Sequence, residues 1–154
     1  SDLSTAAFEA VKQTGATVHR GGAFIVIEGP RFSTKAESQL FRSWGMSIIG
    51  MTACPEAFLA REAELCYTTM AHVTDYDVWH VSEAPVTVEM VVRTLNKNTE
   101  IAQQAIRNLL AGLPAANACA CQDSLANALM TDSRVVPPET KRKLELLVSK
   151  YLRE

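Results

Sequence analysis

Short apolar runs alternate along the first half of the chain with longer segments that have a helical period. A helix is predicted over residues 4–14, where small and apolar side chains recur at helical spacing before a glycine. Apolar runs of strand length follow at 23–27 and 47–51, and each leads through a turn into an amphipathic segment, over 34–44 and 55–64. This order predicts an α/β fold, with helices covering the faces of a sheet.

The turn after the first predicted strand carries the first candidate polar contacts. Glycine and proline force a turn at 28–33, and Thr34 with Glu37 matches a capping box that would start the next helix. Arg31 lies inside this turn. It could bind an anion, or it could form a salt bridge with Glu28 or Glu37, and the sequence leaves both interpretations open.

The longest apolar run, residues 65–73, does not alternate, which predicts a strand buried on both faces. His72 would then be a core histidine. Asp75 and Asp77 come directly after the run, and the crevice outside the carboxyl ends of strands is where α/β sheets bind ligands. Two carboxylates two residues apart share one side of an extended chain, so they could contact one planar ligand. The alternative is an aspartate-rich turn that closes the strand.

Thr52 is a second candidate polar site. It lies between the end of the second predicted strand and Pro55, a residue favoured in the first turn of a helix. A hydroxyl and free backbone N–H groups at this place could hold an anion such as phosphate, or could only cap the helix.

The second half of the chain is predicted to be helical packing. Thr87 caps a long helix that ends near Gly112, a second helix covers 116–130, and a third follows Pro138. We therefore expect one domain over 1–154, with strands and helices in 1–86 and a helical tail in 87–154. Three strands are few for a sheet that must be covered on both faces, so the architecture looks unfinished.

Composition narrows the class of function. The 154 residues have a net charge of −2 without long runs of one sign, which argues against a nucleic-acid surface or a basic membrane-binding face. No apolar stretch reaches the length needed to cross a bilayer, and the start of the chain lacks the features of a signal peptide. We expect a cytoplasmic protein with a small-molecule ligand.

The cysteines and histidines suggest no further chemistry. Cys54 and Cys66 lie in apolar runs and are interpreted as small core residues. Cys119 and Cys121 are interpreted as buried thiols on a helix or as a local disulfide. A metal site is not expected, because such sites usually have a second cysteine pair. His19 and His80 are expected in turns and exposed to solvent.

Six stretches carry a more specific signal, because they match one known family in a register that stays unbroken from the first helix to about Leu110. They are Glu28–Ser38 (EGPRFSTKAES), Phe41–Gly45 (FRSWG), Gly50–Thr52 (GMT), Pro55–Glu56 (PE), Ala60–Glu62 (ARE) and Ala71–Asp77 (AHVTDYD). Together they closely resemble the methylthioadenosine phosphorylases, a family of the purine nucleoside phosphorylase superfamily. The resemblance implies the carboxyl-terminal part of that superfamily's three-layer fold, a mixed sheet flanked by helices.

The reaction that the resemblance implies is phosphorolysis of 5′-methylthioadenosine to adenine and 5-methylthioribose 1-phosphate. This is a pentosyl transfer in purine and methionine salvage, with inorganic phosphate as co-substrate and no metal or organic cofactor. Asp75 would meet purine N7 and favour its protonation, and Asp77 would accept a hydrogen bond from the exocyclic amine. The other implied contacts are Met51 under the ribose, Thr52 at the phosphate, Phe32 near the base, and Val88, Val91 and Val92 around the methylthio group.

The resemblance also implies partners. Family members are nearly twice as long, and their amino-terminal half carries a phosphate loop, an Arg-His phosphate-binding pair and the first strands of the sheet. Because the chain begins at Ser1 rather than methionine, we expect a processed product or a fragment. The amino-terminal half would then be a separate chain, and the complete unit a homotrimer.

Two alternative functions stay open. The chain could belong to a phosphorylase for another adenine nucleoside, such as 5′-deoxyadenosine or adenosine. It could also be a non-catalytic subunit that binds adenine nucleosides.

Overall fold

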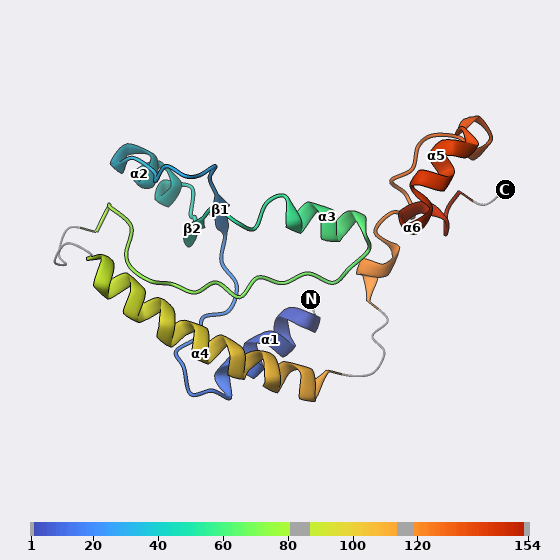
Figure 1. The fold of residues 1–154 in the computed structure, drawn as a ribbon. Coiled ribbons are helices and arrows are strands. Elements are labelled where there is room, and N and C mark those ends of the chain that lie inside the picture. Colours follow the sequence, from blue (N-terminus) through green and yellow to red (C-terminus); the bar gives the residue numbers. More distant parts are fainter. Residues whose placement is uncertain (1, 81–86, 114–118, 153–154) are drawn as a thin grey trace.

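The computed structural model describes residues 2–80, 87–113 and 119–152. Its elements are α1 (Asp2–Lys12), β1 (Phe24–Val26), α2 (Lys35–Ser43), β2 (Ile48–Gly50), α3 (Glu56–Glu62), α4 (Val88–Gly112), the 3-10 turns η1 (Ala120–Asp123) and η2 (Ser133–Val135), α5 (Pro138–Lys143) and α6 (Glu145–Val148) (Figure 1). The helices and the two short strands predicted for the first 64 residues are confirmed, as is the long helix that Thr87 caps.

The sheet of the described residues consists of β1 and β2, which pair in parallel. Phe24 lies opposite Ile48, and Val26 lies opposite Gly50. A Cβ atom on Gly50 would come within 2.8 Å of the Phe24 ring, so only glycine lets the ring lie this close to β2. Helix α2 lies in the crossover connection that the parallel pairing of the two strands requires.

Helices α1 and α4 pack against each other through small side chains, and Figure 1 shows them side by side. Ala10 and Val11 of α1 are buried, and so are Ala102 and Ala105 of α4. The Asn108 side-chain amide also donates to the backbone oxygen of Ala10 at 3.2 Å. This pair of helices contains most of the buried apolar side chains of the described residues.

The prediction of a strand over 65–73 is wrong. The segment crosses the molecule in extended form between α3 and the start of α4 (Figure 1), but it pairs with neither β1 nor β2. Val73 is 62% exposed and His72 is exposed rather than in the core. A strand needs a hydrogen-bonded neighbour about 4.8 Å away, and the segment lies along neither of the open edges of β1 and β2. Side chains hold the segment instead: the Tyr67 hydroxyl donates to the Glu56 carboxylate at 2.6 Å, and the Asn98 amide donates to the Val73 carbonyl at 3.0 Å.

The helical tail also differs from the prediction. The predicted helix over 116–130 is replaced, in its described part, by η1 and a series of turns, while residues 114–118 lie outside the described ranges. Here the backbone N–H of Leu125 donates to the Glu64 carboxylate at 3.0 Å instead of to a helical carbonyl. The predicted third helix forms as α5 and α6, with a break at Leu144.

The chain exposes far more surface than a protein of its size normally does. Its accessible area is 11670 Å², whereas a folded monomer of 16.8 kDa exposes about 7,700 Å². Large apolar side chains, including Phe58, Leu59 and Leu65, account for part of this surface. Within the described ranges, none of the helices has the length and apolar character that a membrane span requires.

Candidate functional site

The capping box predicted at the start of α2 is present and fixes the loop before it. The Thr34 hydroxyl accepts from the Glu37 N–H at 3.2 Å, and the Glu37 carboxylate accepts from the Thr34 N–H at 2.7 Å. Arg31 donates to both oxygens of the same carboxylate at 2.7 and 2.9 Å. These contacts, led by the Arg31 hydrogen bonds, lower the pKa of Glu37 to about 2. The salt-bridge interpretation of Arg31 is therefore confirmed, with Glu37 as the partner.

A second contact joins α2 to the aspartate pair. Ser38 is 2% exposed, and its hydroxyl donates to Oδ2 of Asp77 at 2.5 Å across 39 residues of sequence. Oδ1 of Asp77 accepts from the Val78 N–H at 2.8 Å. Each carboxylate oxygen thus has one protein donor, and an ionised carboxylate can accept about twice that number of hydrogen bonds. Asp77 is held in one orientation and keeps acceptor capacity for a ligand.

One helical turn beyond Ser38, Arg42 contacts the aromatic residues that follow Asp77. Its guanidinium lies over the Trp79 ring, 3.7 Å from the centroid. Tyr76 stacks on His80 with ring centroids 4.3 Å apart, and Trp79 lies edge-on to both rings. Because residues four apart share one face of a helix, Ser38 and Arg42 together hold the segment 76–80 against α2.

Asp75 has a different environment from Asp77. It is exposed, and its Oδ1 accepts from the hydroxyl of its neighbour Thr74 at 2.5 Å. Because no strand precedes it, the strand geometry expected to place both carboxylates on one side is absent. The turn interpretation is supported instead, since the His80 N–H donates to the Asp77 carbonyl at 3.0 Å.

The loop 28–33 lies against the exit of β2. A Cβ atom on Gly29 would come within 2.8 Å of the Met51 sulfur, so glycine permits this close approach. Phe32, in the same loop, is 82% exposed. Thr52 is also exposed, and α3 begins at Glu56 with Pro55 as its N-cap and no side-chain cap, so the capping interpretation of Thr52 is wrong. Its role as an anion contact stays a prediction.

The apolar candidates lie in the first turns of α4. Val88 is 74% exposed, Val92 is exposed and Val91 is half-buried. Figure 1 shows this end of α4 on the same side of the molecule as α2. Two open hollows occur instead on the surface of α5 and α6, lined in part by Arg142, Glu145 and Ser149, and neither includes a candidate site residue.

Sequence reasoning missed Ser38 and Arg42. The available signal was a pair of polar residues four apart on a helix whose apolar residues occupy other positions. That signal is weak, because polar residues at this spacing usually only face solvent.

The fold built by β1, α2, β2 and α3, with Asp77 held on α2, recurs in known proteins. The chain belongs to the phosphorylase superfamily, whose family profile matches residues 1–111. This confirms the resemblance found in the sequence.

Two similar curated proteins carry the same name. S-methyl-5′-thioadenosine phosphorylase of Geobacter sulfurreducens is 46% identical over 152 residues, which cover 99% of this chain and 53% of that protein. The enzyme of the same name from Koribacter versatilis is 50% identical over 145 residues, which cover 94% and 50%. The chain spans about half the length of the curated relatives it matches.

Solved structures agree. A methylthioadenosine phosphorylase from an antarctic soil metagenomic library superposes with a TM-score of 0.84 at 36% identity, over 96% of this chain and 53% of that one. Methylthioadenosine phosphorylase from Schistosoma mansoni, in complex with adenine, gives 0.69 at 28% identity over 81% and 50%. The predicted phosphorylase fold is therefore confirmed.

Proposed function

We propose that this chain is part of an enzyme that converts 5′-methylthioadenosine and phosphate into adenine and 5-methylthioribose 1-phosphate. Relatives that bear the name of this enzyme are 46% and 50% identical over nearly the whole chain. The observation in the structure that best supports an adenine site is the Asp77 carboxylate, oriented by a buried serine.

Asp77 is proposed to select the base. A carboxylate accepts hydrogen bonds from the exocyclic amine of adenine, and it repels the oxygen that 6-oxopurines carry at the same position. Ser38 and the Val78 N–H each occupy one acceptor position on a different oxygen of Asp77. The free acceptor positions are available to the base, and the serine keeps the carboxylate from rotating.

Asp75 is proposed to be the general acid. Adenine leaves poorly as an anion, so a proton delivered to N7 as the glycosidic bond breaks lowers the barrier. A general acid in such a position contributes about 10²–10⁴-fold to the rate. The exposure of Asp75 in this chain suits a group that is covered only when the nucleoside binds.

The remaining contacts follow from the loops around α2. Phe32 lies in the loop that Arg31 and Glu37 fix, where it would stack near the base, and Met51 lies against that loop, where it would support the ribose. Thr52 would contact phosphate. The methylthio group would lie against Val88, Val91 and Val92, since an apolar surface suits a thioether better than a hydroxyl. The reaction needs phosphate as co-substrate and no other cofactor.

The enzyme is proposed to need further polypeptide. Another chain, equivalent to the amino-terminal half of the relatives, would cover this face, and the surface of 11670 Å² and the unpaired run 65–73 support this proposal. It would also supply most of the phosphate site. We also propose that the complete unit, with both halves present, is a homotrimer, as the family resemblance implies.

The test is phosphate-dependent release of adenine by the protein as purified, after intact-mass analysis for a second polypeptide. Methylthioadenosine should be the best substrate. Adenosine is the main competitor, because one similar solved structure is described as an adenosine/methylthioadenosine phosphorylase. 5′-Deoxyadenosine completes the comparison. A preference for inosine would contradict the role of Asp77, and adenine binding without turnover would favour the non-catalytic subunit.

A further inference from the structure

Three of the four cysteines meet outside the candidate active site. The Sγ atoms of Cys66, Cys119 and Cys121 all lie within 4.8 Å of one another, and those of Cys66 and Cys119 are 2.8 Å apart. No metal site was expected from the sequence, because only Cys119 and Cys121 lie close together along the chain. The third thiol comes from 53 residues upstream, so spacing along the chain could not reveal it.

The environments of the cysteines also differ from those predicted. Cys54 and Cys66 are exposed rather than in a core, and Cys119 and Cys121 are half-buried at the start of η1 rather than on an α-helix. All four are free thiols, so the predicted local disulfide is absent. Half-exposed thiols that point at one another can bind a ligand from solvent.

The two segments that carry the three thiols are clamped together by Glu64. Its carboxylate accepts from the Leu125 N–H at 3.0 Å and from the Tyr151 hydroxyl at 2.5 Å. Glu64 has a φ of +56°, a conformation that favours glycine, and its side chain makes the contacts that glycine could not. These contacts lie two residues before Cys66 and four residues after Cys121.

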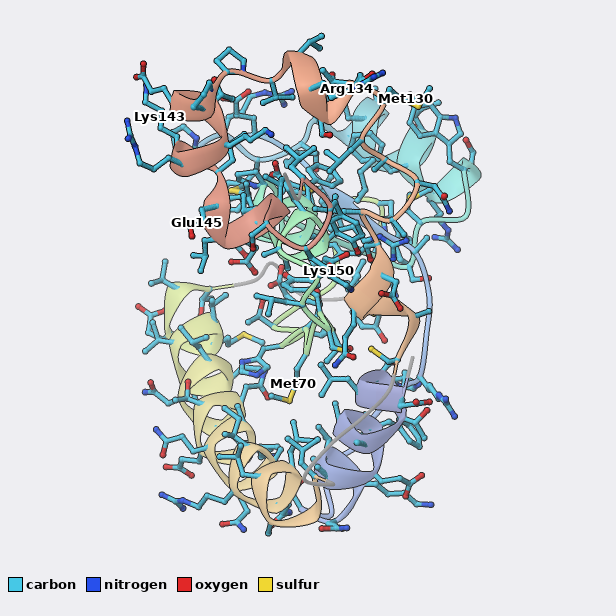
Figure 2. The ribbon with its side chains drawn as sticks, turned by 90° about the vertical axis from the view of Figure 1, so that its right-hand side faces the viewer. Met70, Met130, Arg134, Lys143, Glu145 and Lys150 are labelled. Atoms are coloured by element: carbon cyan, nitrogen blue, oxygen red, sulfur yellow. The ribbon has the colours of Figure 1, made fainter. Side chains whose placement is uncertain are left out.

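Lys150 strengthens the clamp from the end of the chain. Its ammonium donates to the Gln122 carbonyl and to the Asp123 carboxylate, each at 2.6 Å, and lies 3.6 Å from Glu64. Figure 2 shows Lys150 beside the turn that follows the cysteines. The thiols are therefore brought together by a polar network that does not depend on sulfur chemistry.

We propose that Cys66, Cys119 and Cys121 form a three-thiolate site for one zinc ion, with the fourth position open to water. Zinc–sulfur bonds of about 2.3 Å in a tetrahedron place the sulfurs about 3.8 Å apart, so the site needs a small outward shift of Cys66. Binding releases the thiol protons to solvent and changes no oxidation state. Among the described residues, no histidine, aspartate or glutamate joins this group as a fourth ligand.

Such a site would link the C-terminal segment to the start of the run that carries the catalytic pair. Cys66 is the second residue of the segment 65–73, which hydrogen bonds also tie to Glu56 and Asn98. A zinc ion would fix the beginning of this segment, while Ser38 holds Asp77 just beyond its end. The zinc takes no part in phosphorolysis in this proposal, so the two proposals can fail separately.

The experiment uses the protein as purified under reducing conditions without chelators, together with any polypeptide that accompanies it. Elemental analysis should find about one zinc per chain, and Co²⁺ substitution should give the absorption bands of thiolate-bound tetrahedral cobalt. Cys66→Ser and Cys121→Ser should each weaken zinc binding more than about a hundredfold, since even outer-shell changes cost 10–100-fold. Cys54→Ser is the matched control, because Cys54 is an exposed thiol outside the cluster.

Alkylation gives a second readout that does not depend on the folding of variants. Added Zn²⁺ should protect Cys66, Cys119 and Cys121 of the unaltered protein from iodoacetamide while Cys54 reacts. Equal alkylation of all four cysteines with and without Zn²⁺ would overturn the proposal. So would a Cys66–Cys119 disulfide in protein trapped with alkylating agent at isolation, because it would remove two of the three ligands.

Discussion

The two regions that meet at Asp77 are built in opposite ways. Around α2, polar side chains hold their neighbours: Arg31 binds Glu37, Ser38 binds Asp77, and Arg42 covers Trp79. The segment 65–73, directly before the aspartates, is apolar, largely exposed and unpaired. The difference shows that this chain can orient Asp77 by itself but cannot cover the run that leads to it.

The physical reason lies in the reach of the two kinds of interaction. A hydrogen bond or ion pair needs one partner, and α2 offers such partners on two sides. An unalternating apolar run needs a sheet neighbour and a layer over each face to be buried. The described part of the chain supplies a sheet of only two short strands, and the segment 65–73 pairs with neither of them.

Removing Asp75, the proposed acid, should have the largest effect on catalysis. Asp75→Asn keeps the shape of the side chain but cannot deliver a proton to N7. We expect kcat to fall about 10²–10⁴-fold, with a smaller change in adenine affinity. Steady-state kinetics at saturating phosphate measure both quantities.

Asp132→Asn is the control, because Asp132 is an exposed acid that pairs with Arg134 outside the site. It should leave kcat unchanged. A kcat for Asp75→Asn within threefold of the parent value would remove Asp75 from the catalytic role.

A charge on the exposed run 65–73 should weaken its association with the proposed second polypeptide. Val73→Lys places an ammonium where the proposed second polypeptide would cover the segment, and burying an unpaired charge costs several kcal/mol. We expect association with that polypeptide to weaken at least about a hundredfold, measured by titration of the two chains. Leu146→Lys is the control, since Leu146 is 96% exposed on α6. Equal affinity of the two variants would show that 65–73 is not the covered face.

The same contrast explains how much of the fold the sequence predicted. Capping signals are local, so Thr34 and Glu37 correctly marked the start of α2, and Thr87 marked the start of α4. The run 65–73 was wrongly predicted as a strand, because periodicity reports how apolar a segment is and not whether it has a partner. The helix over 116–130 failed for a similar reason, since Glu64 diverts the backbone N–H of Leu125.

The candidate site was predicted in part. The family resemblance pointed to Asp75 and Asp77, and the choice between salt bridge and anion for Arg31 needed coordinates. Ser38 and the three-cysteine cluster could not be predicted, because each joins residues 39 or more positions apart. Contacts at that separation follow from how elements pack, which no local pattern encodes.

Removing the serine tests whether α2 orients the base-binding carboxylate. Ser38→Ala leaves Asp77 without its buried donor, and such a loss costs about 1–3 kcal/mol, or roughly 5–150-fold. We expect KM for the nucleoside to rise about tenfold with a smaller change in kcat, and discrimination against inosine to weaken. Ser43→Ala is the control on the same helix, because its hydroxyl only contacts the Leu40 carbonyl. Lower stability with unchanged KM and unchanged selectivity would assign Ser38 a purely structural role.

The smallest effect should appear in the pH dependence of stability, through the ion pair that fixes the loop 28–33. Because Arg31 and the capping contacts lower the pKa of Glu37 from 4.5 to about 2, the folded state favours the ionised carboxylate. The stabilisation is therefore fully present above pH 4.5 and is lost as the pH falls through about 2. Glu37→Gln cannot titrate, so its melting temperature should lie below that of the parent protein above pH 4.5 and approach it near pH 2. Thermal unfolding at several pH values measures this difference, and added salt should reduce it, since the pair is largely exposed. A gap between the two proteins that stays constant with pH would mean that the Glu37 carboxylate does not hold the loop through its charge.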